Sequence, residues 1–236
     1  MATSKNSGKL FLFAMVALIG GAMGYGYFAQ SSKLSAESGT AAANPQLSTE
    51  QRALLTPKPS DIILGDSNAL VTIVEYSSLS CPHCAHFHEK VLPGLEKEFI
   101  DTGKVKLVMR HFPLNEPALA AAKIVECAGR NGLERNNFMK VFFNLQAQWA
   151  FGESFLKDLK QIALVGGIDS AAFDSCATDK TIETRILTMR QAAAEKLGVN
   201  STPSFFVHGT KFVGEPSLAG LRAAIAAAGP GTPTAK

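Results

Sequence analysis

The chain has 236 residues, with 23 Lys and Arg against 20 Asp and Glu and a formal net charge of +3. That length suffices for one domain with a sizeable core once a targeting segment and a linker are set aside. Lys5 and Lys9 are the only charged residues before position 33, so the remainder is nearly neutral. This charge balance argues against a nucleic-acid-binding surface.

The N-terminal segment has the features of an export signal. Lys5 and Lys9 precede a long uncharged run rich in Leu, Phe, Met, Ala and Gly, which predicts a signal peptide over residues 1–32. Because an apolar run of about 20 residues can also span a bilayer, a signal anchor through residues 10–30 is the alternative. A buried core helix is disfavoured because the run has no polar face. Either way, the rest of the chain is expected outside the cytoplasm, where disulfides persist.

Residues 33–59 are expected to form a flexible linker, because they are rich in Ser, Ala and Thr. Ser48 and Gln51 within it have the spacing of a capping box, which predicts a short helix there. The folded domain is expected over residues 60–228. A disordered tail, residues 229–236, should follow it.

The first part of the domain predicts a strand–helix–strand unit. Three short apolar runs between turn residues are typical of buried strands: residues 62–64, 69–76 and 105–111. A helix beginning at Pro82 separates the last two, and Pro93 inside it predicts a kink or a break. Two parallel strands joined by a helix form a right-handed βαβ unit.

An all-helical insertion is expected at about residues 115–198, because helical spacing continues there without a comparable strand candidate. Its helices are predicted over residues 118–127, 138–148, 155–164, 170–176 and 181–197. After it, Ser204–His208 and Lys211–Val213 predict a hairpin across Gly209-Thr210. Residues 216–228 then form a closing helix, so that a ββα unit shares one sheet with the βαβ unit.

The most informative motif is Cys81-Pro82-His83-Cys84, at the junction of a predicted buried strand and a helix. Two cysteines separated by two residues can close a small disulfide. The partial positive charge of a helix N-terminus favours the thiolate of the first cysteine. The motif therefore predicts a thiol–disulfide exchange site rather than a structural disulfide.

Zinc binding by Cys81, Cys84, His86 and His88 is the alternative interpretation of this region. Histidines separated by one residue point about 200° apart around a helix, and a proline after Cys81 favours a helix start over a ligand loop. We therefore expect neither a metal nor another cofactor. His86 and His88 are expected at the surface or in a groove.

Together these features resemble the exported DsbA-like thiol:disulfide interchange proteins of the thioredoxin superfamily. The resemblance rests on the Cys-Pro-His-Cys motif, on Thr202-Pro203 before the predicted hairpin and on the helical insertion. It covers roughly residues 60–228, the size of a single domain. It implies an α/β, thioredoxin-like fold with an inserted all-helical subdomain.

The resemblance assigns roles to the motif. Cys81 is the exposed nucleophile and Cys84 the buried resolving thiol, with Pro82 and His83 completing the catalytic motif. His83 is expected to direct a hydrogen bond or positive charge at the Cys81 sulfur, which lowers the thiol pKa and stabilises the reduced form. Glu75 matches a buried acid of the family that could take the proton of Cys84. A solvent-facing Glu75 on an edge strand is the alternative.

Thr202 and Pro203 are implied to bind substrate. Pro203 is expected to follow a cis peptide bond beside the active disulfide, leaving nearby backbone free to pair with an extended client segment. Many DsbA proteins have Val where this chain has Thr202, a residue also found in some isomerases. The difference bears on client range and redox poise rather than on the reaction class.

Cys127 and Cys176 lie on two different predicted helices. In an oxidising compartment such a leftover pair suggests a second, structural disulfide, and some related proteins carry one. It would close a loop of roughly 50 residues and stabilise the fold by ~4 kcal/mol on the loop-entropy model. Two unpaired buried cysteines are the alternative.

The expected function is to introduce disulfides into newly exported proteins of the periplasm. Its partners would be unfolded, cysteine-containing proteins and a DsbB-like membrane protein that reoxidises it. One alternative is a disulfide isomerase or reductase, although residues 31–60 are too short and polar for a dimerisation domain. The other is a non-catalytic chaperone on a thioredoxin scaffold.

Overall fold

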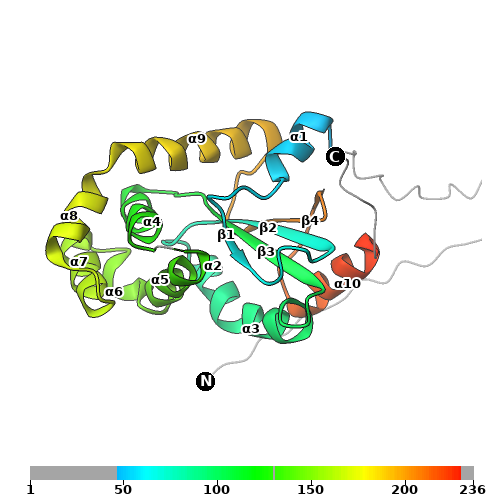
Figure 1. Ribbon diagram of the computed structural model, residues 1–236, viewed down its shortest axis with the longest axis horizontal. Helices are drawn as coiled ribbons and strands as arrows, with labels where there is room; N and C mark the ends of the chain where they lie inside the picture. The colour runs from blue at the N-terminus through cyan, green and yellow to red at the C-terminus, as the bar shows by residue number, and fades with distance from the viewer. Residues whose placement is uncertain (1–46, 130, 230–236) are drawn as a thin grey trace, which may run out of the picture. The chain divides into compact units, whose positions relative to one another are not determined.

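The computed structural model describes residues 47–129 and 131–229 (Figure 1). The predicted signal segment, most of the linker and the last seven residues of the tail lie outside these ranges. None of the helices in the described ranges has the length and hydropathy needed to traverse a bilayer.

A five-stranded mixed sheet forms the centre of the described domain, in the order β1-β3-β2-β4-β5 (Figure 1). The strands are β1 (Ile62–Leu64), β2 (Val71–Ser77), β3 (Val105–His111), β4 (Ser204–Val207) and β5 (Thr210–Lys211). Strands β2 and β3 are parallel, and the other neighbours are antiparallel. The predicted βαβ and ββα units therefore share one sheet, and the predicted fold class is confirmed.

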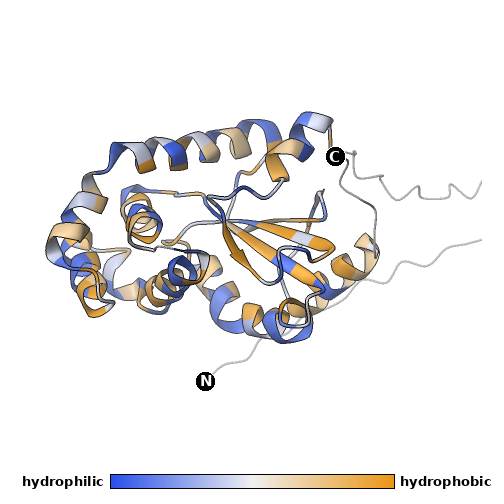
Figure 2. Ribbon diagram, viewed as in Figure 1, coloured by the Kyte–Doolittle hydropathy of each residue, from blue (hydrophilic) through white to orange (hydrophobic). Residues whose placement is uncertain are grey.

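Alternation along β2 assigns its side chains to two different cores. Val74 and Tyr76 pack with α1 (Thr49–Leu55) and α9 (Lys180–Leu197). Val71 and Ile73 face the opposite core, which includes the helix that follows β2. Figure 2 shows the hydrophobic strands between these helical layers. Glu75 and Ser77 have the parity of Ile73 and therefore face the helix carrying the cysteines.

The helix after β2 is continuous but irregular, so of the two outcomes predicted at Pro93, a kink or a break, the break is wrong. It consists of α2 (Pro82–His86), η1 (Phe87–Val91), α3 (Leu92–Leu95) and η2 (Glu96–Ile100), where η denotes a π-helix. Pro93 has no N–H to donate. The turn before it widens, and the Leu92 N–H bonds to the Phe87 carbonyl five residues back. The π turn thus absorbs the proline without ending the helix.

The described residues of the insertion form helices and no strand, as predicted. It contains α4 (Glu116–Ala128), α5 (Gly132–Asn144), α6 (Gln146–Trp149), α7 (Phe155–Val165), α8 (Ser170–Thr178) and α9. The single helix predicted over 138–148 is two helices, which meet at Leu145 with a non-helical ψ of 15°. A disulfide joins Cys127 of α4 to Cys176 of α8 within this block, with a Cα–Cα distance of 5.5 Å.

The hairpin between β4 and β5 turns one residue earlier than predicted. Its turn residues are His208 and Gly209, with φ of 48° and 83°, instead of Gly209-Thr210. Two successive positive φ values are those of a type I′ turn, whose twist matches the flanking strands. Helix α10 (Leu218–Ala228) follows and packs against the sheet and α3.

Arg110 on β3 ties the N-terminal segment to the sheet. Its guanidinium donates to both carboxylate oxygens of Asp61, at 3.0 and 2.7 Å, and to the carbonyls of Leu54 and Thr56 at either side of the end of α1. The two charged side chains are only 2% and 4% exposed. The predicted capping box of Ser48 is formed at the start of α1.

We predict that Asp61→Asn destabilises the fold by about 3 kcal/mol, because it leaves the buried Arg110 charge without a counter-charge. The matched control is Asp174→Asn, which breaks an ion pair with Lys160 whose side chains are 62% and 30% exposed. That change should cost no more than ~1 kcal/mol. Urea unfolding of both variants measures the difference. Equal losses of unfolding free energy in the two variants would show that the buried Arg110–Asp61 pair stabilises the fold no more than an exposed ion pair does.

Candidate active site

The Cys-Pro-His-Cys motif forms the N-terminus of α2, directly after the carboxyl end of β2. Cys81 is the N-cap residue, and Pro82 is at the start of the helix. The Cys81 carbonyl accepts the N–H groups of Cys84 and Ala85, each at 3.1 Å. Proline suits this position because its missing N–H would have no partner there. Both Cys81 and Cys84 are free thiols in this structure.

The loop before β4 lies against Cys81. The Thr202–Pro203 peptide bond is cis, as predicted, and Cys81 Sγ lies 3.3 Å from the Thr202 carbonyl oxygen, to which the protonated thiol donates. This loop contributes to the burial of Cys81, which is only 6% exposed. Cys81 is therefore a buried residue, and the expectation of an exposed nucleophile is wrong.

The two thiols have opposite acid–base properties. The pKa of Cys81 is lowered from 9.0 to about 5, chiefly because the Cys84 thiol donates a hydrogen bond to it, and despite its burial. The Thr202 side chain and the backbone N–H groups of Cys84 and His83 lower it further. Cys81 is therefore a thiolate at neutral pH, the reactive form of a thiol.

His83 acts differently from the expectation. Its side chain is exposed, and the hydrogen bond by which it lowers the Cys81 pKa comes from its backbone N–H. The helix N-terminus supplies this donor whatever side chain is present at position 83. The imidazole is not among the groups that lower the Cys81 pKa.

Cys84 is fully buried, and burial raises its pKa well above the ordinary thiol value. The hydrogen bond to Cys81 and the charge of Glu75 raise this pKa further, while the Ser77 side chain opposes them. Glu75 is fully buried on β2, which has a strand on each side. The alternative of a solvent-facing Glu75 on an edge strand is therefore wrong.

His88 belongs to this buried cluster, and the expectation that it lies at the surface or in a groove is wrong. It is 5% exposed, and its Nε2 lies 3.0 and 3.1 Å from the two carboxylate oxygens of Glu75. Its spacing from Cys84 could have indicated this, because residues four apart share one helix face. His86 is exposed, as expected.

Gln146 is a second site residue that the sequence did not reveal. Its buried side-chain amide, at the start of α6, donates to the carbonyls of Leu79 and Cys81 at 2.7 and 3.1 Å. The helical insertion thereby holds the loop that carries the nucleophile. No local sequence signal identifies a glutamine that contacts a loop 65 residues away.

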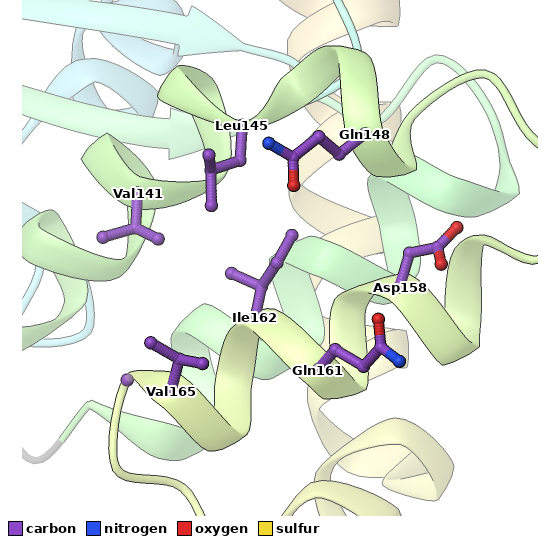
Figure 3. Close-up of a pocket in the computed structure, with 8 residues that line it drawn as sticks. Val141, Leu145, Gln148, Asp158, Gln161, Ile162 and Val165 are labelled. Carbon is purple, nitrogen blue, oxygen red and sulfur yellow. The ribbon is translucent and has the colours of Figure 1, made fainter.

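The residues that the structure describes contain no cluster of three or more potential metal ligands. A groove of about 380 Å³ lies elsewhere, between α5, α6 and α7 (Figure 3). Its lining contains no cysteine or histidine: Val141, Leu145, Gln148, Asp158, Gln161, Ile162, Val165 and Gly166. The groove therefore holds none of the thiol or imidazole groups of the site.

The fold and the paired thiols define a dithiol–disulfide site on a thioredoxin-like scaffold. A thioredoxin family model matches residues 57–227. The crystal structure of Wolbachia pipientis alpha-DsbA1 is 34% identical, with a TM-score of 0.70, covering 75% of this chain and 94% of that one. The chain therefore belongs to the thioredoxin family and to its DsbA-like branch.

Other relatives agree with this assignment. A Rickettsia typhi protein, proposed to be a protein-disulfide oxidoreductase, is 32% identical over 64% of this chain and 56% of its own length. The chain thus spans about half the length of the curated relatives it matches. A protein-disulfide isomerase structure from Novosphingobium aromaticivorans has a TM-score of 0.64 at 23% identity, covering 72% of this chain and 98% of that one, and so shares the fold.

We predict that replacing the hydrogen-bond donors of Cys81 raises its pKa above about 5. Cys84→Ala should raise it most, because the Cys84 thiol is the largest contributor, and Thr202→Val should raise it less. His83→Ala should leave it nearly unchanged, since the backbone N–H remains. The measurement is ultraviolet thiolate absorbance against pH, on the reduced protein. A larger effect from His83→Ala than from Cys84→Ala would contradict the assignment.

Proposed function

We propose that the protein is an exported thiol:disulfide oxidase that transfers the Cys81–Cys84 disulfide to cysteine-containing proteins. The observation that carries this proposal is the position of Cys81 at the N-terminus of α2, where the surrounding donors lower its pKa to about 5. A thiolate that is stable at neutral pH stabilises the reduced protein, so the oxidised form is a strong disulfide donor.

The transfer takes two steps. A client thiolate attacks Cys81 of the oxidised protein, forming a mixed disulfide while the Cys84 sulfur leaves with the electron pair. Cys84 then takes up a proton, because its pKa is raised well above the ordinary value. A second client thiolate attacks the client sulfur, which closes the client disulfide and releases Cys81 as its stable thiolate.

The other site residues support these steps. We propose that Glu75, whose charge acts on Cys84, gives and takes the Cys84 proton within the buried site. Thr202 and Pro203 lie beside Cys81 and would bind an extended client segment by backbone pairing. Pro82 starts the helix whose N–H groups stabilise the thiolate, and His83 contributes one of those groups.

The proposed surroundings are the periplasm and its inner membrane. Residues 1–32 would export the protein or anchor it, which keeps the site in an oxidising compartment. A DsbB-like membrane protein would accept the electrons of the reduced pair and restore the disulfide. The bonded Cys127 and Cys176 would then serve as a structural disulfide within the helical insertion.

Equilibration of the Cys81–Cys84 pair with glutathione buffers tests the direction of transfer. We expect a reduction potential nearer the ~−120 mV of a strong oxidant than the ~−270 mV of thioredoxin. A value close to thioredoxin's would favour a reductase. An intermediate value with rapid repair of scrambled disulfides would favour an isomerase.

Peptide oxidation tests the remaining alternative, a non-catalytic chaperone. Wild-type protein should oxidise a reduced two-cysteine peptide, and Cys81→Ser should not. A Cys127→Ser/Cys176→Ser variant is the control, because it removes two cysteines without touching the proposed reactive pair. A wild-type protein that leaves the peptide reduced would favour the chaperone.

A further inference from the structure

Glu75 and His88 make an unusual contact in the centre of the domain. Glu75 is fully buried, and its neighbours on the adjoining strands are Met109 and Phe205, neither of which carries a charge or a hydrogen-bond donor in its side chain. Its two carboxylate oxygens are 3.0 and 3.1 Å from His88 Nε2. The imidazole is thus the side chain that compensates this buried acid.

A purely structural role is a poor explanation for the contact. His88 stacks on Phe143 with ring centroids 4.4 Å apart and meets Phe87 edge-on at 5.4 Å. In such an aromatic environment a well-packed apolar pair is often as stabilising as a buried ionic one, or more so. Two polar groups here therefore point to chemistry.

The second ring nitrogen indicates which form of His88 fits the site. Nδ1 is buried and has no hydrogen-bond partner among the described residues. A buried N–H without a partner is rarer in proteins than an unused acceptor. The geometry therefore fits the neutral ring with its proton on Nε2, where that proton is shared between the two oxygens of Glu75.

Among the described residues, the groups on which the charge of Glu75 is seen to act are Cys84 and His111. Ser77 of its own strand and Cys84 of α2 belong to the same buried cluster. From β3 comes His111, whose pKa is lowered by its complete burial, so that its ring is neutral at neutral pH. Beyond His111, the carboxylate of Glu126 on α4 forms ion pairs with Arg135 of α5 and Arg185 of α9, so both guanidinium groups are directed at Glu126. Among these described groups no permanent cation pairs with Glu75, and the imidazole of His88 is the hydrogen-bond partner of its carboxylate.

We propose that His88 is a positioning residue of the exchange reaction, which holds the Glu75 carboxylate ready to take the proton of Cys84. The proposal rests on the proposed function of the Cys81–Cys84 pair. In the step concerned, the proton moves from Cys84 Sγ to a Glu75 oxygen. The Cys84 sulfur forms a bond to the Cys81 sulfur, and the group disulfide-bonded to Cys81 leaves as a thiolate with the electron pair.

A single-turnover reaction isolates this step. The reduced protein is converted to a mixed disulfide between Cys81 and thionitrobenzoate, and attack by Cys84 releases the coloured thionitrobenzoate anion. Its release rate is measured from pH 5 to pH 9 in wild type, Glu75→Gln, His88→Leu and His88→Gln. The exposed His86→Leu is the matched control on the same helix, and Cys84→Ala should release nothing.

We expect His88→Leu to slow release at neutral pH by at least about tenfold, a part of the ~10²–10⁴ that a positioned general base contributes. In this variant the Glu75 carboxylate loses its Nε2–H donor and its fixed orientation, so release should depend more on solvent base and rise more steeply with pH than in wild type. His88→Gln, which restores an N–H donor, should stay close to wild type in rate and in pH profile. Combining Glu75→Gln with His88→Leu should slow release no further than Glu75→Gln alone, because His88 acts through Glu75.

Three outcomes would overturn the proposal. A pH profile of His88→Leu identical to that of wild type would mean that His88 has no part in the proton transfer. Faster release of thionitrobenzoate by His88→Leu than by wild type would mean that Glu75 acts only through its charge, which raises the Cys84 pKa. Additive losses in the double variant would mean that His88 acts independently of Glu75.

The test is separate from that of the proposed function. Thionitrobenzoate release is intramolecular and needs no client, so it can proceed in a protein that fails to oxidise peptides. A protein that oxidises peptides while His88→Leu releases thionitrobenzoate with the wild-type profile refutes only the role of His88.

Discussion

The hydrogen bonding of β2 to β3 on one edge and to β4 on the other is the constraint on which the site depends. It fixes β2 in the middle of the sheet, with a core on each face. Because successive side chains of a strand point to opposite faces of the sheet, Glu75 and Ser77 both lie on the face that packs against the helix of Cys84. Cys81 follows the carboxyl end of β2 and is the N-cap of α2. Strand β4 begins directly after Thr202 and Pro203.

Their surroundings make the two thiols of one motif chemically different. Cys84, inside the core beside Glu75, keeps its proton and donates a hydrogen bond to the Cys81 sulfur. Cys81, at the N-terminus of α2 and surrounded by hydrogen-bond donors, loses its own proton although it too is buried. Each effect strengthens the other, because the protonated thiol is the main donor to the thiolate. The helical insertion contacts this site through Gln146, which donates to two carbonyls of the loop between β2 and α2.

Local signals in the sequence identified most elements of this fold. Apolar β-branched runs gave β1, β2 and β3, and helical spacing with intervening glycines gave the insertion. The differences arose where backbone geometry decides. The π turn of η1 carries the helix past Pro93, and a type I′ turn uses His208 and Gly209 for the hairpin. Both depend on how the flanking elements pack, which short sequence windows do not encode.

The sequence by itself identified the Cys81–Cys84 pair as the candidate exchange site, because the two cysteines stand two residues apart at a predicted strand–helix junction, whereas Pro203 and Glu75 were assigned through the resemblance that this motif carries. Only the tertiary structure decided that His88 is buried against Glu75, that Gln146 holds the Cys81 loop and that His83 contributes its backbone N–H. These three roles depend on which surfaces meet. A histidine or glutamine on a helix has the same local pattern whether its neighbours are water or a buried carboxylate, and packing alone makes that choice.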